Sequence, residues 1–253
     1  MSGVIALHGG GEFLPGDEAF LTAWLRSARH EGRHPTTDAP MRIVVIPTAA
    51  ARGRPALAAA NGVAAIQRVA ASLGLDSAVS SVAVLDRMRA DDPELAERIA
   101  GADAIHLPGG DPDLIPTVLA GTAAWAAIRE AVAAGAALAG ASAGAMALAA
   151  WTWTADGGTT GLGLLPGPPL VVMPHADAVS WERALARFGP HLPAGLGILG
   201  LSERTGVVLD ADPASRAPWR VVGEGDVRWS PAGGDPSQPR VFAAGETFLP
   251  GAG

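Results

Sequence analysis

The sequence has 253 residues, a formal net charge of −7, and neither lysine nor cysteine. The missing lysine excludes Schiff-base and Ser–Lys mechanisms, and the missing cysteine excludes disulfides, a thiolate nucleophile and Cys-ligated metals. The acidic balance argues against nucleic acid as a partner, because no basic stripe is available to neutralise phosphates. No secretory signal or membrane span is evident, so we expect a cytoplasmic protein.

Short apolar runs alternate with helix-length segments along most of the chain. Several runs are almost continuous Val, Ile, Leu and Ala, which is typical of strands buried on both faces of a parallel sheet. The predicted strands are Val4–His8, Arg42–Pro47, Ser80–Leu85, Ala104–Leu107, Ala136–Gly140, Leu170–Met173, Gly197–Leu201 and Gly206–Leu209.

The segments between these strands have helical patterns. We predict that Asp17 caps the first helix and that its apolar face contains Trp24. The predicted helices are Glu18–His30, Pro55–Leu73, Asp91–Ala100, Asp111–Leu119, Thr122–Ala134 and Ala143–Ala150. Repeated β–α units predict a doubly wound α/β fold, with a mostly parallel sheet and helices on both faces.

The end of the chain has a different pattern, with short apolar runs separated by Gly/Pro-rich turns. These runs predict antiparallel strands at Trp219–Val222, Val227–Ser230 and Arg240–Phe242. We see no linker that splits the chain. We therefore expect one domain over residues 1–253, with residues 219–253 as its β-rich extension.

The pentapeptide Gly140-Ala141-Ser142-Ala143-Gly144 lies between a predicted strand and a predicted helix. In this context G-x-S-x-G forms a nucleophile elbow, which exposes the serine hydroxyl at the end of a sheet. The amides at the start of the following helix would then face a developing oxyanion. A small-residue turn that only connects strand and helix would give the same pattern.

Two further glycine-rich turns follow predicted strands, His8-Gly9-Gly10-Gly11 and Pro108-Gly109-Gly110-Asp111. In open parallel sheets, sites form outside the carboxyl ends of the strands. Glycines at this edge would let backbone amides approach a substrate oxygen. Each turn, taken singly, is also explained by tight turning alone.

A serine nucleophile needs a base and an acid that orients the base. Among the six histidines, His175 is the best placed, because it follows the predicted strand Leu170–Met173. His8 and His106 lie in predicted strands as core histidines. The acid is either Glu203, which lies alone between two apolar runs, or Asp156, and the spacing leaves both open.

This order of motifs resembles the dipeptidase E and cyanophycinase family of serine peptidases, whose fold is related to class I glutamine amidotransferase domains. The matching pieces are Gly9–Gly11, Leu107–Asp111, Gly140–Ala145, Gly161–Gly167, His175, Gly197–Glu203 and Ala244–Glu246. The resemblance implies Ser142 as nucleophile, His175 as general base and Glu203 as acid. It also implies an oxyanion hole made by the backbone amides of Gly110 and Ala143, with no cofactor and no metal.

The segment around His175 differs from that of cyanophycinases, where the histidine resembles Asp-Gln-His-Phe followed by closely spaced arginines. Here it is Met173-Pro174-His175-Ala176-Asp177, and Arg183 and Arg187 come later. We therefore expect short peptides as substrates in place of cyanophycin. The candidate substrate contacts are Gly10, Asp111, Asp156 and Arg183. A homodimer is one candidate for the oligomeric state, which the sequence does not determine.

One competing function is that of an α/β-hydrolase esterase, because His8–Gly11 matches the lipase HGGG motif. That motif should follow the third strand, however, and here it follows the first. The hydrolase order also places the acid before the histidine, which would require Asp156 with His175 or Asp177 with His191.

Two further functions would involve no serine chemistry. A catalytically silent, amidotransferase-like binding protein would share the fold, although it would not need Ser142, His175 and Glu203 together. Zinc chemistry is suggested by H-E-x-x-H at His30–His34, but Gly32 lies inside the match and Pro35 follows it. That segment is better explained as the solvated end of a helix.

Overall fold

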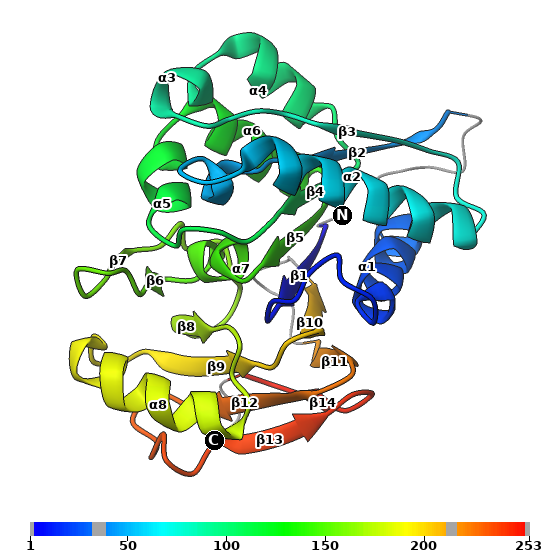
Figure 1. Cartoon of the computed structure of the whole chain (residues 1–253). Helices are drawn as coiled ribbons and strands as arrows, with labels where there is room; N and C mark the ends of the chain where they lie inside the picture. Colours follow the sequence, from blue (N-terminus) through cyan, green and yellow to red (C-terminus); the bar gives the residue numbers. More distant parts are fainter. Residues whose placement is uncertain (1–2, 32–38, 211–216, 251–253) are drawn as a thin grey trace.

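The computed structural model describes residues 3–31, 39–210 and 217–250, and the described chain forms two β-sheets with helices around them (Figure 1). In the order of pairing, the strands of the larger sheet are β14 (Thr247–Phe248), β11 (Trp219–Gly223), β10 (Thr205–Asp210), β1 (Val4–His8), β5 (Ala137–Ala141), β4 (Ala104–Leu107), β2 (Met41–Val45) and β3 (Ser77–Ser81). The smaller sheet contains β13 (Arg240–Ala243), β12 (Asp226–Ser230), β9 (Gly197–Leu201), β8 (Leu170–Met173), β6 (Trp151–Thr152) and β7 (Thr159–Thr160).

The larger sheet is mostly parallel, as the sequence predicts. Strands β1, β5, β4, β2 and β3 pair in parallel, while β10, β11 and β14 add antiparallel strands at one edge. The sequence pattern did not reveal that β8 and β9 belong to a second sheet, in which they pair in parallel with each other.

Helices cover both faces of the larger sheet, which confirms the doubly wound α/β prediction (Figure 1). Because side chains alternate along a strand, Ile5 and Leu7 of β1 enter one core, and Val4 and Ala6 enter the other. The helices are α1 (Glu18–Glu31), α2 (Pro55–Ser72), α3 (Arg87–Ala90), α4 (Pro93–Ala100), α5 (Leu114–Leu119), α6 (Ala123–Ala133), α7 (Ala143–Leu148) and α8 (Ala178–Phe188), with 3-10 turns η1 (Thr48–Ala50) and η2 (Gly189–His191). Among the described residues, no helix is both long and apolar enough to span a bilayer.

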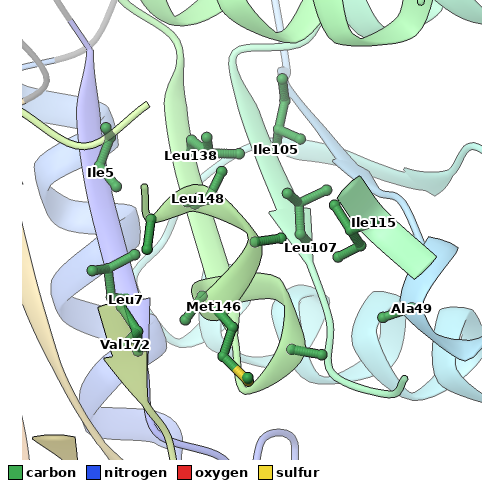
Figure 2. Close-up of a cluster of buried hydrophobic side chains, with 14 of the residues drawn as sticks. Ile5, Leu7, Ala49, Ile105, Leu107, Ile115, Leu138, Met146, Leu148 and Val172 are labelled. Carbon is green, nitrogen blue, oxygen red and sulfur yellow. The ribbon is translucent and has the colours of Figure 1, made fainter. Parts of the chain in front are cut away.

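The short helix α7 is anchored in the larger of the two cores. Figure 2 shows its side chains Met146 and Leu148 beside Leu138 of β5 and Leu107 of β4. Val172 of β8 belongs to the same cluster, so the two sheets share this core. The element that follows Ser142 is therefore held on several sides by apolar contacts, which keeps the preceding turn in a fixed place.

Some predicted boundaries are wrong for identifiable reasons. The strand predicted at Ser80–Leu85 is β3, Ser77–Ser81, because its pairing stops where its partner β2 ends at Val45. Val82 and Val84 are buried but lie beyond this strand.

The side chain of Asp17 is buried just before α1. Its carboxylate accepts a hydrogen bond from the Phe13 N–H at 2.9 Å and faces His8. The Asp17 side chain therefore holds the loop that precedes α1.

Candidate active site

Ser142 occupies a strained turn between β5 and α7. Its backbone has φ 48° and ψ −113°, a combination that a non-glycine residue rarely adopts. Gly144 permits this turn, because a Cβ at that position would clash with the Leu107 carbonyl oxygen. The Ser142 N–H also donates to the His8 carbonyl at 2.9 Å. The elbow that the sequence predicts is thus present in the backbone.

Three side chains from different parts of the chain form one row of hydrogen bonds. Ser142 Oγ lies 3.1 Å from His175 Nε2, and Glu203 Oε1 lies 2.9 Å from His175 Nδ1. Because a carboxylate can only accept, Nδ1 carries the proton and Nε2 is left to accept from the serine hydroxyl. The pair is open to solvent, with the His175 and Glu203 side chains 48% and 57% exposed.

The partners of Ser142 come from adjacent strands of the smaller sheet. His175 lies two residues after β8, and Glu203 lies two residues after β9. These strands run parallel, so their carboxyl ends reach the same edge and bring the imidazole and the carboxylate together. His175 also has a positive φ of 53°, a second strained position at this edge.

A partly buried ion pair connects both of these loops. Arg228 of β12 binds Asp226 and donates to the Ala176 carbonyl at 2.7 Å, directly after His175. Asp226 in turn accepts from the Ser202 hydroxyl at 2.6 Å, directly before Glu203. One arginine is therefore connected to the loops that carry the base and its carboxylate.

The turn after β1 connects all three segments through its carbonyl groups. His8 accepts from Ser142 N–H, Gly9 accepts from His175 N–H at 2.8 Å, and Gly10 accepts from Arg204 N–H at 2.8 Å. From its glycines we predicted that the backbone amides of this turn face a substrate. The structure shows that the carbonyl groups accept hydrogen bonds from the three loops and hold them in place.

Gly10 lies directly against the His175 ring. Its φ is +114°, and a Cβ there would collide with the ring carbon Cε1. We expect Gly10→Ala to displace the imidazole and to lower kcat/KM by about 100-fold or more, because small misplacements of catalytic groups are costly. Gly74→Ala is the matched control, since Gly74 also has a positive φ (+64°) but nothing within 4 Å of a Cβ.

Gly74→Ala should lose on the order of 1 kcal/mol of stability from its left-handed backbone, and Gly10→Ala should lose more, because its φ of +114° lies outside the left-handed α region and its Cβ meets the His175 ring. Thermal unfolding measures this loss, and peptide hydrolysis measures the difference between them. Near-normal hydrolysis by Gly10→Ala would show that the imidazole does not depend on this contact.

Two backbone N–H groups beside Ser142 are available for an oxyanion. Among the described residues, neither the Gly110 nor the Ala143 amide has a hydrogen-bond acceptor. The amide of Gly109 is occupied, because it donates to Glu12 Oε1 at 2.8 Å. Gly110 and Ala143 both line the cavity beside Ser142, so the two amides that the family resemblance implies are near the nucleophile.

A cavity of about 340 Å³ opens beside Ser142 and His175. Its wall is mostly apolar, formed by Met146, Trp153, Met173 and Phe188. Trp153 is fixed by its Nε1–H, which donates to the Phe188 carbonyl at 3.3 Å. Arg187 lines the rim with its guanidinium 5.0 Å from the Phe188 ring centroid.

The remaining predicted substrate contacts have different surroundings. Asp111 is paired with Arg52 at 2.7 Å, and hydrogen bonds to Asp113 and Arg52 lower the pKa of Asp111. Asp156 is exposed, and its carboxylate has no hydrogen-bond partner among the described residues. On α8, Arg187 lines the cavity beside Ser142, whereas Arg183 one turn earlier does not.

Among the described residues, no histidine side chain other than His175 forms a hydrogen bond with Ser142. His8 and His106 are fully buried, His8 Nε2 lies 2.9 Å from Asp17, and burial lowers the pKa of His106 to about 3. His30 lies in the last turn of α1, and the rest of the H-E-x-x-H match, apart from Glu31, lies outside the described residues.

The residue order of an α/β-hydrolase would need Asp156 or Asp177 as the acid. Asp156 has no hydrogen-bond partner among the described residues, and Asp177 is engaged elsewhere. Asp177 accepts from the Ser180 N–H at 2.8 Å at the start of α8, and this bond lowers the pKa of Asp177. The His175 ring is bonded to Glu203, which follows it in the chain. The order Ser142, His175, Glu203 differs from that of α/β-hydrolases.

Comparison with known families decides among these functions. The model of peptidase family S51 matches residues 21–216, which include Ser142, His175 and Glu203. The chain belongs to peptidase family S51. It is therefore grouped with the serine peptidases of the dipeptidase E and cyanophycinase family, and not with the α/β-hydrolase esterases.

Solved structures agree with membership of family S51. A peptidase from an acI-B1 Actinobacterium is 28% identical, with a TM-score of 0.78, and the match covers 98% of this chain and 97% of that protein. A putative peptidase E protein from Listeria monocytogenes EGD-e has 16% identity and a TM-score of 0.56, covers 88% and 98% of the two chains, and supports the fold alone. The comparison with curated proteins gives no match.

Proposed function

We propose that this S51 peptidase cleaves short peptides with Ser142 as nucleophile, His175 as general base and Glu203 as the carboxylate that orients the base. The observation that carries the proposal is the continuous row of hydrogen bonds, 3.1 Å from Ser142 to His175 and 2.9 Å from His175 to Glu203. The carboxylate fixes the imidazole tautomer that can accept the serine proton. We further propose that residues 1–253 act as one domain.

In the first step Ser142 Oγ attacks the scissile carbonyl carbon while its proton moves to His175 Nε2. The imidazolium that forms is stabilised by Glu203, and the carbonyl oxygen becomes an oxyanion. The free amides of Gly110 and Ala143 would donate to that oxygen, and the second amide lies at the start of α7, where the helix dipole favours negative charge.

Collapse of this intermediate breaks the C–N bond, and His175 gives its proton to the leaving amine. A water molecule then attacks the acyl-serine, again with His175 as base, and the carboxylic acid leaves as Ser142 regains its proton. Every proton passes through His175 Nε2. Because Gly10 lies against this ring, we expect the glycine turn after β1 to position the base.

The cavity favours one small apolar or aromatic group next to the scissile bond. Its volume of about 340 Å³ is at the small end of ligand sites, and its wall is mostly hydrophobic. Arg187 at the rim offers one positive group to a substrate carboxylate. A β-Asp-Arg polymer would need several charged contacts, and the segment after His175 lacks the closely spaced arginines that would supply them.

The substrate proposal predicts a clear order of rates. Free dipeptides with an apolar residue should be hydrolysed at least about 100-fold faster than casein or cyanophycin, because the small cavity beside Ser142 suits a short chain. The measurement is release of new amino groups from the three substrates at equal concentrations of scissile bonds. Rapid release of β-Asp-Arg from cyanophycin would show that our interpretation of the His175 segment is wrong.

A further inference from the structure

A buried histidine and a buried aspartate face each other beside the glycine turn after β1, and the proposed reaction gives neither side chain a part. His8 is the last residue of β1, and Asp17 directly precedes α1. His8 Nε2 lies 2.9 Å from Asp17 Oδ1, although the two groups are not aligned as in a straight hydrogen bond. Because a buried carboxylate is costly unless polar partners satisfy it, the pair calls for an explanation.

Each member of the pair accepts a backbone hydrogen bond from the turn. His8 Nδ1 accepts from the Gly10 N–H at 3.4 Å, and Asp17 Oδ2 accepts from the Phe13 N–H at 2.9 Å. Phe13 has a positive φ of 66°, which a bulky residue rarely adopts. The two side chains therefore hold the turn in a conformation that the backbone alone would not favour.

The bond to Gly10 determines which nitrogen of His8 carries the ring proton. The Gly10 amide is buried, and its one hydrogen-bond acceptor among the described residues is His8 Nδ1. Nδ1 can accept only without a proton, so the proton is on Nε2, the nitrogen that faces the carboxylate. The negative charge of Asp17 stabilises this tautomer. Asp17 thus keeps His8 in the form that can hold the Gly10 amide.

The Gly10 backbone in turn limits where the imidazole of the proposed base can lie. A Cβ on Gly10 would collide with His175 Cε1, and the Gly9 carbonyl accepts from the His175 N–H at 2.8 Å. The turn therefore contacts both the ring and the backbone of His175. Displacement of the Gly10 amide would move the imidazole relative to Ser142 Oγ, which is 3.1 Å from His175 Nε2.

We propose that His8 is a positioning residue for the base, with its tautomer set by Asp17. His8 Nδ1 holds the Gly10 amide, and the Gly10 backbone keeps the His175 ring in line with Ser142. The inference rests on the proposed role of His175. It adds a buried imidazole–carboxylate pair that acts on the reaction only through the turn it holds.

Two substitutions of His8 separate the hydrogen bond from the packing. Leucine and asparagine have the same branched shape and both are too short to replace Nε2 beside Asp17, but only asparagine offers an acceptor near the position of Nδ1. We expect His8→Leu to lower kcat on an apolar dipeptide about tenfold or more, with KM within about twofold, because a misplaced base slows the chemical step. His8→Asn should recover most of that loss. Equal kcat values in the two variants would overturn the proposal.

Proton NMR follows the contact itself, independently of hydrolysis. In the native protein the Gly10 Hα protons should give a strong nuclear Overhauser effect to His175 Hε1, because Gly10 lies against the ring carbon Cε1. The effect should be lost or much weaker in His8→Leu and retained in His8→Asn. An unchanged effect in His8→Leu would show that another contact places the ring.

The tautomer of His8 is measurable in the native protein, which keeps the proposal testable if a variant does not fold. Nitrogen–proton correlation spectra should show a proton on Nε2 and none on Nδ1. The His8 ring is identified by its contact with Phe20, whose ring centroid is 4.4 Å away. A proton on Nδ1 would refute the proposal, because that nitrogen could then not accept from Gly10.

His106→Leu is the matched control, because His106 is another fully buried histidine next to the turn. Its ring centroid is 5.2 Å from that of Phe13, and neither ring nitrogen has a hydrogen-bond partner among the described residues. This variant should keep the native kcat and the Gly10–His175 Overhauser effect. If it lowers kcat as much as His8→Leu does, general packing beside the turn explains both results and His8 has no specific role.

Ser142→Ala and the NMR measurement separate this proposal from the proposed function. Hydrolysis that survives in Ser142→Ala, together with a Gly10–His175 contact that depends on His8, would refute the proposed function alone. Loss of hydrolysis in Ser142→Ala, together with a contact that does not depend on His8, would refute the role of His8 alone.

Discussion

Ser142→Ala should lower kcat/KM for an apolar dipeptide by about four to six orders of magnitude, because the nucleophile of a triad acts together with its base. The residual rate would come from binding and from the two oxyanion amides. The free energy of unfolding should change by less than about 0.5 kcal/mol, since alanine keeps the Cβ and removes only a partly exposed hydroxyl.

The assay is dipeptide hydrolysis followed to long times on purified, folded protein. Ser72→Ala is a suitable control, because Ser72 is a serine at the end of α2 whose hydroxyl donates to the Val69 carbonyl at 2.7 Å. That variant should retain full activity. Substantial hydrolysis by a clean Ser142→Ala preparation would mean that another group attacks the peptide.

Glu203→Gln should lower kcat by about 100- to 1,000-fold. Glutamine has the same size, but it cannot stabilise the imidazolium and its amide can hold the imidazole in the unproductive tautomer. We expect a smaller effect than in a buried triad, because Glu203 and His175 are about half exposed and water can partly replace the carboxylate.

Asp156→Asn tests the competing acid in the same assay. Asp156 is exposed and has no hydrogen-bond partner among the described residues, so this variant should keep nearly full activity. The measurement is kcat for both variants on one dipeptide. A larger loss from Asp156→Asn than from Glu203→Gln would assign the acid to Asp156.

The fold was predictable to the extent that burial determines it. Continuous apolar runs such as Val4–His8 located the strands buried on both faces, and repeated β–α units gave the correct class. The edge strand β3, Ser77–Ser81, was misplaced because it is partly exposed and three of its five residues are serine. Apolar patterns also carry no pairing information, so the separate sheet that contains β8 and β9 could not be foreseen.

The candidate active site was also predictable only in part. Strand ends, chain order and the family resemblance were enough to select Ser142, His175 and Glu203, which the structure brings within hydrogen-bonding distance. The contact of Gly10 with the His175 ring was not predicted, because the sequence does not tell which side chain packs against the glycine turn.

Covalent labelling tests the central claim most directly. A serine-directed phosphonate, followed by proteolysis and mass spectrometry, should modify the peptide that contains Ser142 with one label per chain. His175→Ala should slow the labelling strongly, because the hydroxyl then has no base 3.1 Å away to accept its proton. Labelling of a different residue, or full peptidase activity in a preparation whose Ser142 is completely modified, would contradict the account.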